Sequence, residues 1–194
     1  MLIDADVRAL LDEAAALDEP DFEIASAAEV RALFAARPSW AGASVAVARI
    51  DDRIVPGPHG DIQVRVYTPH AHGAAAGLVY FHGGGWVHGD LEMVDVPCRA
   101  LCRHGGCVVI SVDYRLAPEH KFPVPLEDCY AATRYVAEHP TEFDVDPGRL
   151  AVGGDSAGGN LAAAVALLAR DRSRPSIAFQ LLVYPITDYS FDTP

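Results

Sequence analysis

A serine set between glycines is the first feature of this sequence that could do chemistry. The sequence G-D-S-A-G at residues 154–158 follows a short apolar run, Leu150 to Gly153, and precedes an alanine- and leucine-rich run, Asn160 to Leu168. G-x-S-x-G between a strand and a helix is typical of a nucleophile elbow, a tight turn that raises a serine hydroxyl above a sheet. The glycines are needed because side chains would collide with the neighbouring backbone. Ser156 is therefore the candidate nucleophile.

A second glycine motif strengthens this interpretation. The sequence H-G-G-G-W at residues 82–86 directly follows an apolar run, Leu78 to Phe81. Three successive glycines leave backbone N–H groups bare and able to approach a ligand. Such donors can stabilise the oxyanion of a tetrahedral intermediate, and each is worth about 3 kcal/mol in enzymes of this type. A merely flexible glycine loop is the alternative.

The elements that must position these motifs alternate along the chain. Continuous apolar strands separated by helices indicate a parallel sheet covered on both faces, and so an α/β fold. An antiparallel pair, joined by the turn G-P-H-G at 57–60, is predicted before this alternation begins. The predicted strands are 45–55, 62–67, 78–81, 107–112, 150–153 and 177–184, and the predicted helices are 98–105, 126–137 and 160–168.

The first part of the chain follows a different pattern. Val7, Leu10 and Leu11 recur at helical spacing before Pro20. A capping box, S-A-A-E at residues 26–29, predicts the start of a second helix. We therefore assign 1–42 to an N-terminal helical segment and 43–194 to an α/β core.

Composition excludes several classes of function. The 194 residues are 51% hydrophobic, enough for one domain with a sizeable core. The formal net charge of −12 opposes binding to nucleic acid or anionic membranes. No apolar stretch reaches the roughly 20 residues of a bilayer crossing. The first residues lack the basic region of a signal peptide, so the sequence predicts a cytoplasmic protein.

The four cysteines do not have the spacing of a metal site. Cys98, Cys102, Cys107 and Cys129 lie on predicted helices and strands rather than in closely spaced ligand pairs. We expect buried, reduced thiols that act as small hydrophobic side chains, and no bound metal.

Together the motifs resemble those of the hormone-sensitive-lipase-like (GDXG) family of α/β-hydrolase carboxylesterases and lipases. The resemblance rests on H-G-G-G-W at 82–86, D-Y-R-L-A-P-E-H at 113–120 and G-G-D-S-A-G-G-N at 153–160, with Tyr184-Pro185 after the last strand. It implies an α/β-hydrolase fold, a mostly parallel sheet with helices on both faces, and a helical cap formed by the N-terminal segment. It also implies hydrolysis of small carboxylic esters without a cofactor.

The resemblance further implies roles for individual residues. Ser156 would form an acyl-enzyme. The backbone N–H groups of Gly84, Gly85 and Ala157 would form the oxyanion hole, and Gly83 would shape its loop.

Supporting roles follow from the same resemblance. His82 would hold the glycine loop through hydrogen bonds rather than transfer protons. Asp155 would support the elbow, although a solvated turn carboxylate is the alternative. Trp86 would line an acyl pocket, whereas Phe34 and Trp40 could equally be core residues. A buried polar network is expected from Asp113, Tyr114, Arg115 and Glu119.

One departure from the family affects activity. In this fold the triad follows the chain order serine, acid, histidine. Asp188 and Asp192 follow Ser156, but they come too early for the family's acid, and His88 beside the glycine loop is only a weak alternative base. All eight histidines precede the serine: His59, His70, His72, His82, His88, His104, His120 and His139.

Three explanations for the missing base remain open. The chain could be part of a longer esterase, with acid, base and last strands beyond residue 194. It could be a short product that needs a partner to complete the sheet, or a ligand-binding pseudo-hydrolase. In each case 177–184 would be an exposed apolar edge, open to the remainder of a chain or to another copy. We expect little or no turnover from these 194 residues alone.

Overall fold

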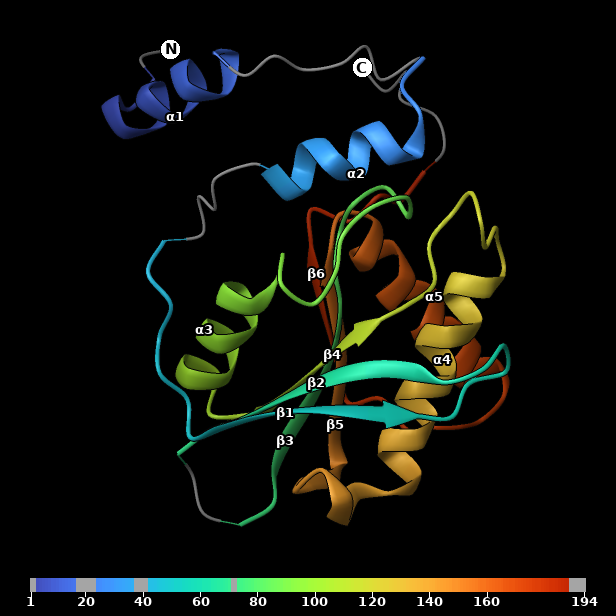
Figure 1. The fold of residues 1–194 in the computed structure, drawn as a ribbon. Helices are drawn as coiled ribbons and strands as arrows, with labels where there is room; N and C mark the ends of the chain where they lie inside the picture. The colour runs from blue at the N-terminus through green and yellow to red at the C-terminus, as the bar shows by residue number, and fades with distance from the viewer. Residues whose placement is uncertain (1–2, 17–23, 37–41, 71–72, 189–194) are drawn as a thin grey trace. The chain divides into compact units, whose positions relative to one another are not determined.

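The computed structural model of the protein describes residues 3–16, 24–36, 42–70 and 73–188 (Figure 1). The chain divides into two compact units, Met1–Arg37 and Pro38–Pro194.

The described residues of the first unit form α1 (Ala5–Ala15) and α2 (Ala27–Ala36). The Asp4 carboxylate caps α1 by accepting the Asp6 N–H at 3.0 Å. At the start of α2 the Ser26 N–H donates to the Glu29 carboxylate at 2.8 Å, and the Glu29 N–H donates back to Ser26 Oγ at 3.3 Å. The predicted capping box is therefore confirmed.

The second unit is built on a six-stranded sheet in the order β1-β2-β4-β3-β5-β6 (Figure 1). β2 is antiparallel to β1 and β4, whereas β4, β3, β5 and β6 run parallel to one another. The predicted antiparallel pair and parallel sheet are confirmed. The strands are β1 (Arg49–Val55), β2 (Ile62–Thr68), β3 (Ala75–Phe81), β4 (Val108–Asp113), β5 (Val145–Asp155) and β6 (Phe179–Val183).

The strand boundaries that differ most from the prediction are the starts of β1 and β5. β1 begins at Arg49, whereas we had expected residue 45. β5 begins at Val145 rather than Leu150, because Ala75 pairs with Val145 across a register shift between Ala75 and Gly77. Pro147 and Gly148 interrupt the apolar pattern there, so the apolar pattern does not predict the first half of β5.

Helices cover both faces of the sheet. α3 (Asp95–Gly105) lies on one face, and α4 (Val124–Glu138) and α5 (Ala157–Asp171) lie on the other (Figure 1). A short 3₁₀ turn, Pro140–Glu142, follows α4. The residue after α3, Gly106, caps the helix with a left-handed φ of 61°, as the glycine pair at 105–106 predicts.

The core consists of two clusters separated by the sheet. Residues that alternate along each strand point to opposite faces, so Val79 and Phe81 of β3 pack toward α4 and α5, whereas Leu78 and Tyr80 pack toward α3. The thiols of Cys98, Cys102 and Cys129 are buried as expected, and Cys107 is half-buried.

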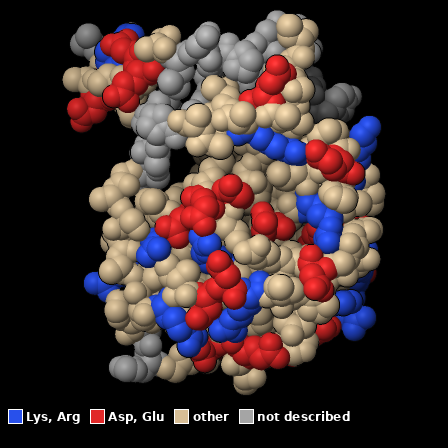
Figure 2. Space-filling model, viewed as in Figure 1, with Lys and Arg blue, Asp and Glu red and all other residues tan. Residues whose placement is uncertain are grey.

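Charged side chains of both signs mix on the face formed by β1 and β2 (Figure 2). There Arg65 pairs with Asp52 at 2.6 Å and with Glu92 at 2.7 Å. This face carries no broad field of one sign.

Candidate active site

Ser156 lies where β5 passes directly into α5. Its φ of 53° and ψ of −118° are rare for a residue with a side chain. The Ser156 N–H donates to the Val183 carbonyl of β6 at 2.9 Å, and the Ser156 carbonyl accepts the Asn160 N–H at 3.1 Å. The hydroxyl-bearing residue is thus held in a strained turn by hydrogen bonds on both sides, the geometry of a nucleophile elbow.

The glycines around Ser156 are required by a close approach to β3. A Cβ on Gly154 would lie 2.4 Å from the Phe81 carbonyl oxygen, and one on Gly158 would lie 1.9 Å from the same atom. This oxygen belongs to the backbone and cannot rotate away as a side-chain atom could. The first turn of α5 therefore packs directly against the end of β3, just before the glycine loop begins.

The glycine loop at residues 83–85 lies against the elbow. The Gly83 N–H donates to the Asp155 carboxylate at 3.1 Å, and a Cβ on Gly83 would lie 2.3 Å from the same group. Gly84 and Gly85 adopt φ values of 117° and 59°, which favour glycine. The Gly84 carbonyl accepts the N–H groups of both Val87 and His88 at 3.0 Å, so the loop closes on itself in a tight turn.

Three backbone donors stay available next to the serine. Ala157 is the first residue of α5, so its N–H has no acceptor within the helix. Across the described ranges, no hydrogen bond from the N–H of Gly84, Gly85 or Ala157 to a protein acceptor is found. The structure thus brings together the three residues expected to form an oxyanion hole.

Asp155 joins the ends of three strands. Its carboxylate accepts the hydroxyls of Tyr80 of β3 at 2.9 Å and Tyr184 beyond β6 at 3.3 Å, besides the Gly83 N–H. Burial raises the pKa of Tyr80, which keeps this phenol a donor. The geometry is that of a support for the elbow rather than of a solvated turn carboxylate.

His82 is fully buried and held on two sides. Its ring stacks on Tyr114 with centroids 4.3 Å apart, and the Tyr114 hydroxyl donates to the His82 carbonyl at 2.7 Å. Burial lowers the pKa of His82, so the ring is neutral near pH 7. Nδ1 lies 2.7 Å from the Gly83 carbonyl, which can only accept, and Nδ1 therefore carries the proton. Nε2 is buried without a partner within the described part of the chain.

The polar segment after β4 includes a partner that the sequence analysis missed. Arg115 makes two contacts of 2.9 Å with the carboxylate of Asp128, which is fully buried on α4. Asp128 sits among apolar residues of the helical stripe, and a charge in that position could have been recognised as a buried partner. Burial raises the pKa of Asp113 beside this segment.

The aromatic residues predicted for the acyl pocket lie in separate parts of the chain. Trp86 is half-buried, packs against the core cluster on the α4 and α5 face, and accepts the Ala117 N–H on its carbonyl at 2.8 Å. Phe34 belongs to the first unit. Trp40 and Asp192 lie outside the described residues.

Among the described residues, no basic side chain forms a hydrogen bond with the Ser156 hydroxyl. No hydrogen bond to the Ser156 hydroxyl is found within ranges 3–16, 24–36, 42–70 and 73–188. His88 contacts the glycine loop through its backbone N–H. In these same ranges no group of three or more His, Cys, Asp or Glu residues could hold a metal ion, and no helix has the length and apolar character to span a bilayer.

Comparison with known proteins agrees with this geometry. The sequence profile of a family described as alpha/beta hydrolase fold matches residues 78–194. The chain belongs to this family. The predicted resemblance to its hormone-sensitive-lipase-like members is confirmed.

Relatives within the family are named as hydrolases. Carboxylic ester hydrolase LipN of Mycobacterium tuberculosis is 48% identical over 175 residues, covering 88% of this chain and 46% of LipN. Arylacetamide deacetylase of Bos taurus is 43% identical over 143 residues, covering 69% of this chain and 36% of that protein. A hyperthermophilic esterase from Pyrobaculum calidifontis superposes with a TM-score of 0.89 at 39% identity, over all of this chain and 62% of that one. The chain therefore spans about half the length of its curated relatives.

Proposed function

We propose that these residues form the nucleophile-bearing part of a carboxylic ester hydrolase. The observation that carries the proposal is the elbow at Ser156 packed against a glycine loop in which the Gly84 and Gly85 N–H groups make no hydrogen bond within the described residues. Relatives named as esterases share both the sequence and the fold. They do not favour the pseudo-hydrolase alternative.

The mechanism follows from the positions of these atoms. Ser156 Oγ attacks the ester carbonyl carbon, the N–H groups of Gly84, Gly85 and Ala157 stabilise the oxyanion, and loss of the alcohol leaves an acyl-enzyme that water hydrolyses. A serine hydroxyl needs a base to accept its proton. We propose that the acid and the base lie beyond residue 194.

The surrounding residues act by positioning. His82 fixes the Gly83 carbonyl through its Nδ1–H, and Asp155 fixes the Gly83 N–H, so both peptide groups that flank Gly83 are anchored. We propose that Trp86 lines the acyl pocket and that residues 1–42 form an N-terminal helical cap segment. The substrate is a small-molecule ester.

The location and assembly of the protein are proposed from the sequence. A cytoplasmic location rests on the acidic composition of the chain, with its formal net charge of −12. Association through the β6 edge, with the remainder of a longer chain or with another copy, rests on the exposed apolar side chains of that strand.

A covalent chimera tests the proposed activity. Residues 1–194 are joined to the part of LipN that follows its match to this chain, and hydrolysis of a short-chain aryl ester is measured. We expect turnover in the chimera, a loss of at least about a thousandfold in Ser156→Ala, and no change in Ser44→Ala, an exposed control. We expect little or no turnover from residues 1–194 alone.

Two outcomes would contradict the proposal. Rapid hydrolysis by residues 1–194 that Ser156→Ala abolishes would show that the base is already present. A folded chimera that binds the ester without consuming it, equally well with Ser156→Ala, would show a binding protein.

A further inference from the structure

The segment that follows β4 contacts the glycine loop at both of its ends. At the first end, the Tyr114 hydroxyl donates to the His82 carbonyl at 2.7 Å, and the two rings stack with centroids 4.3 Å apart. At the second end, the Ala117 N–H donates to the Trp86 carbonyl at 2.8 Å. We call residues 114–117, which hold both ends of the loop, the clamp.

The residues between these two anchored carbonyls do not keep their shape by their own preferences. Gly84, Gly85 and Trp86 have φ values of 117°, 59° and 62°. Glycine adopts many backbone conformations, and a positive φ is costly for a residue with a large side chain. The surrounding contacts must therefore hold the Gly84 and Gly85 N–H groups in the direction that an oxyanion requires, and the clamp supplies two of these contacts.

The clamp is itself bound to a buried carboxylate on α4. The Arg115 N–H donates to the Asp128 carboxylate at 3.2 Å, and Arg115 Nη1 lies 2.9 Å from each of its two oxygens. Arg115 Nη2 also donates to the Asp61 carbonyl at 3.2 Å. The Asp128 side chain is fully buried, whereas that of Arg115 is 20% exposed. Both the main chain and the side chain at the middle of the clamp are thus held by one carboxylate.

Stability alone does not explain a carboxylate in this position. A buried ion pair adds little net stability, because taking both charges out of water offsets most of their attraction. The buried neighbours of Asp128 on α4 include Cys129 and Ala132, so an apolar side chain would suit the same environment. What an apolar side chain cannot supply is an acceptor for the Arg115 N–H. The carboxylate therefore fixes the course of the clamp.

We propose that Asp128 is a positioning residue for the oxyanion hole, and that it acts through Arg115 and the clamp on the N–H groups of Gly84 and Gly85. This inference rests on the ester hydrolysis proposed above. Among the described residues, no hydrogen bond joins Asp128 to the glycine loop directly. Its effect should appear in kcat rather than in KM, because the oxyanion develops only in the transition state.

The first test needs no substrate. It uses the chain with Trp40→Phe, in which Trp86 is the single tryptophan. Arg115→Met combined with Asp128→Leu removes both charges together, so that no unpaired charge is left buried. We expect Trp86 fluorescence to shift to longer wavelength. We also expect the Ala117 N–H to exchange at least about tenfold faster, because its hydrogen bond to the glycine loop opens more often.

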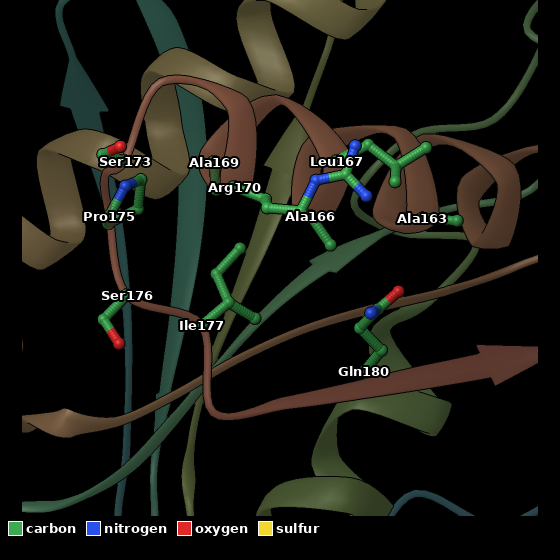
Figure 3. A pocket seen from close by; sticks show the side chains of 10 residues that line it. All are labelled: Ala163, Ala166, Leu167, Ala169, Arg170, Ser173, Pro175, Ser176, Ile177 and Gln180. Carbon is green, nitrogen blue, oxygen red and sulfur yellow. The ribbon is translucent and has the colours of Figure 1, made fainter.

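A matched control removes an ion pair of the same residue types away from the clamp. Arg170 of α5 pairs with Asp171 at 2.8 Å, and the two side chains are 71% and 60% exposed. Figure 3 shows Arg170 on α5, beside the groove that this helix forms with Ile177 and Gln180. Arg170→Met combined with Asp171→Leu should leave both the fluorescence and the amide exchange unchanged.

The second test measures ester hydrolysis in the chimera described above. Arg115→Met with Asp128→Leu should lower kcat by about tenfold or more and leave KM within about twofold. Asp128→Asn keeps an acceptor for the Arg115 N–H and weakens only the contacts of the guanidinium. This variant should remain folded and lower kcat by about threefold. The control pair on α5 should change neither constant.

Three results would overturn the inference: an unchanged kcat in both Asp128 variants, equal effects in the Arg170 and Asp171 control, or a raised KM at constant kcat. The fluorescence and exchange measurements separate this inference from the proposed function. A chimera that hydrolyses no ester, while Trp86 emission and Ala117 exchange change as expected, would support the ordering of the loop by Asp128 and contradict the proposed function.

Discussion

The two sides of Ser156, toward β3 and toward β6, differ in how closely the surrounding residues pack. Toward β3, the elbow meets the backbone of Phe81 and the glycine loop so closely that only hydrogen fits on Gly154 and Gly158. Toward β6, the Ser156 N–H donates to the Val183 carbonyl, yet every side chain of that strand except Leu181 is exposed. Within the described residues, the side of Ser156 toward β3 is therefore closely packed, whereas the side toward β6 is exposed.

The first prediction compares one phenylalanine from each flank. Phe81→Ala should lower the free energy of unfolding by about 4 kcal/mol, because it opens a cavity in the buried core. Phe179→Ala should lower it by less than about 0.5 kcal/mol, because that side chain is already in water. Urea denaturation measures both. A comparable loss in the two variants would show that β6 is covered in solution.

The second prediction concerns the contact between the elbow and β3. Gly158→Ala should destabilise the protein by about 3 kcal/mol, since its Cβ would overlap the Phe81 carbonyl and neither backbone can move freely. Gly148→Ala is the control, because the nearest atom to its Cβ is a side-chain oxygen of Asp146 at 3.3 Å. Thermal unfolding compares the two. Equal melting temperatures of Gly158→Ala and Gly148→Ala would mean that Gly158 does not lie this close to the Phe81 carbonyl in solution.

The third and smallest effect concerns pH and His82. Burial lowers the pKa of His82 in the folded state, whereas the unfolded value is about 6.5. Below about pH 6.5 the unfolded chain binds a proton that the folded chain does not, so stability decreases as the pH falls. Between pH 7.5 and 5.5 the wild type should lose about 1 kcal/mol more than His82→Asn.

Denaturant titrations at the two pH values measure this difference. His104→Asn, on the exposed end of α3, should keep the wild-type pH dependence. If His82→Asn also kept it, His82 would not be the neutral, buried anchor of the glycine loop.

Local patterns predicted most of the elements because their causes are local. The capping box at Ser26, the glycine end of α3 and the apolar runs of β3 and β4 each depend on a few neighbouring residues. The first half of β5 was missed because it is stabilised by pairing with Ala75, a residue distant in the sequence. The start of β1 was placed too early for a similar reason, since the strand extends only as far as its partner β2.

The residues of the candidate site also separate into those with local causes and those that depend on distant contacts. Ser156, the glycine loop, His82 and Asp155 were found from motifs, since a tight turn demands particular residue types in sequence. The roles of Tyr80, Tyr184 and Asp128 were missed because they exist only once separate strands and helices meet. A tyrosine hydroxyl at the end of an apolar strand, and a carboxylate within an apolar helical stripe, were the available signals.

By itself the sequence determined the α/β family, and it predicted the nucleophile and the donors of the oxyanion hole. It also determined that no histidine follows the serine within these 194 residues. Only the tertiary structure decided which carboxylate anchors the glycine loop and which nitrogen of His82 carries the proton. These depend on distances between groups far apart in the chain, and such distances exist only after the sheet has formed.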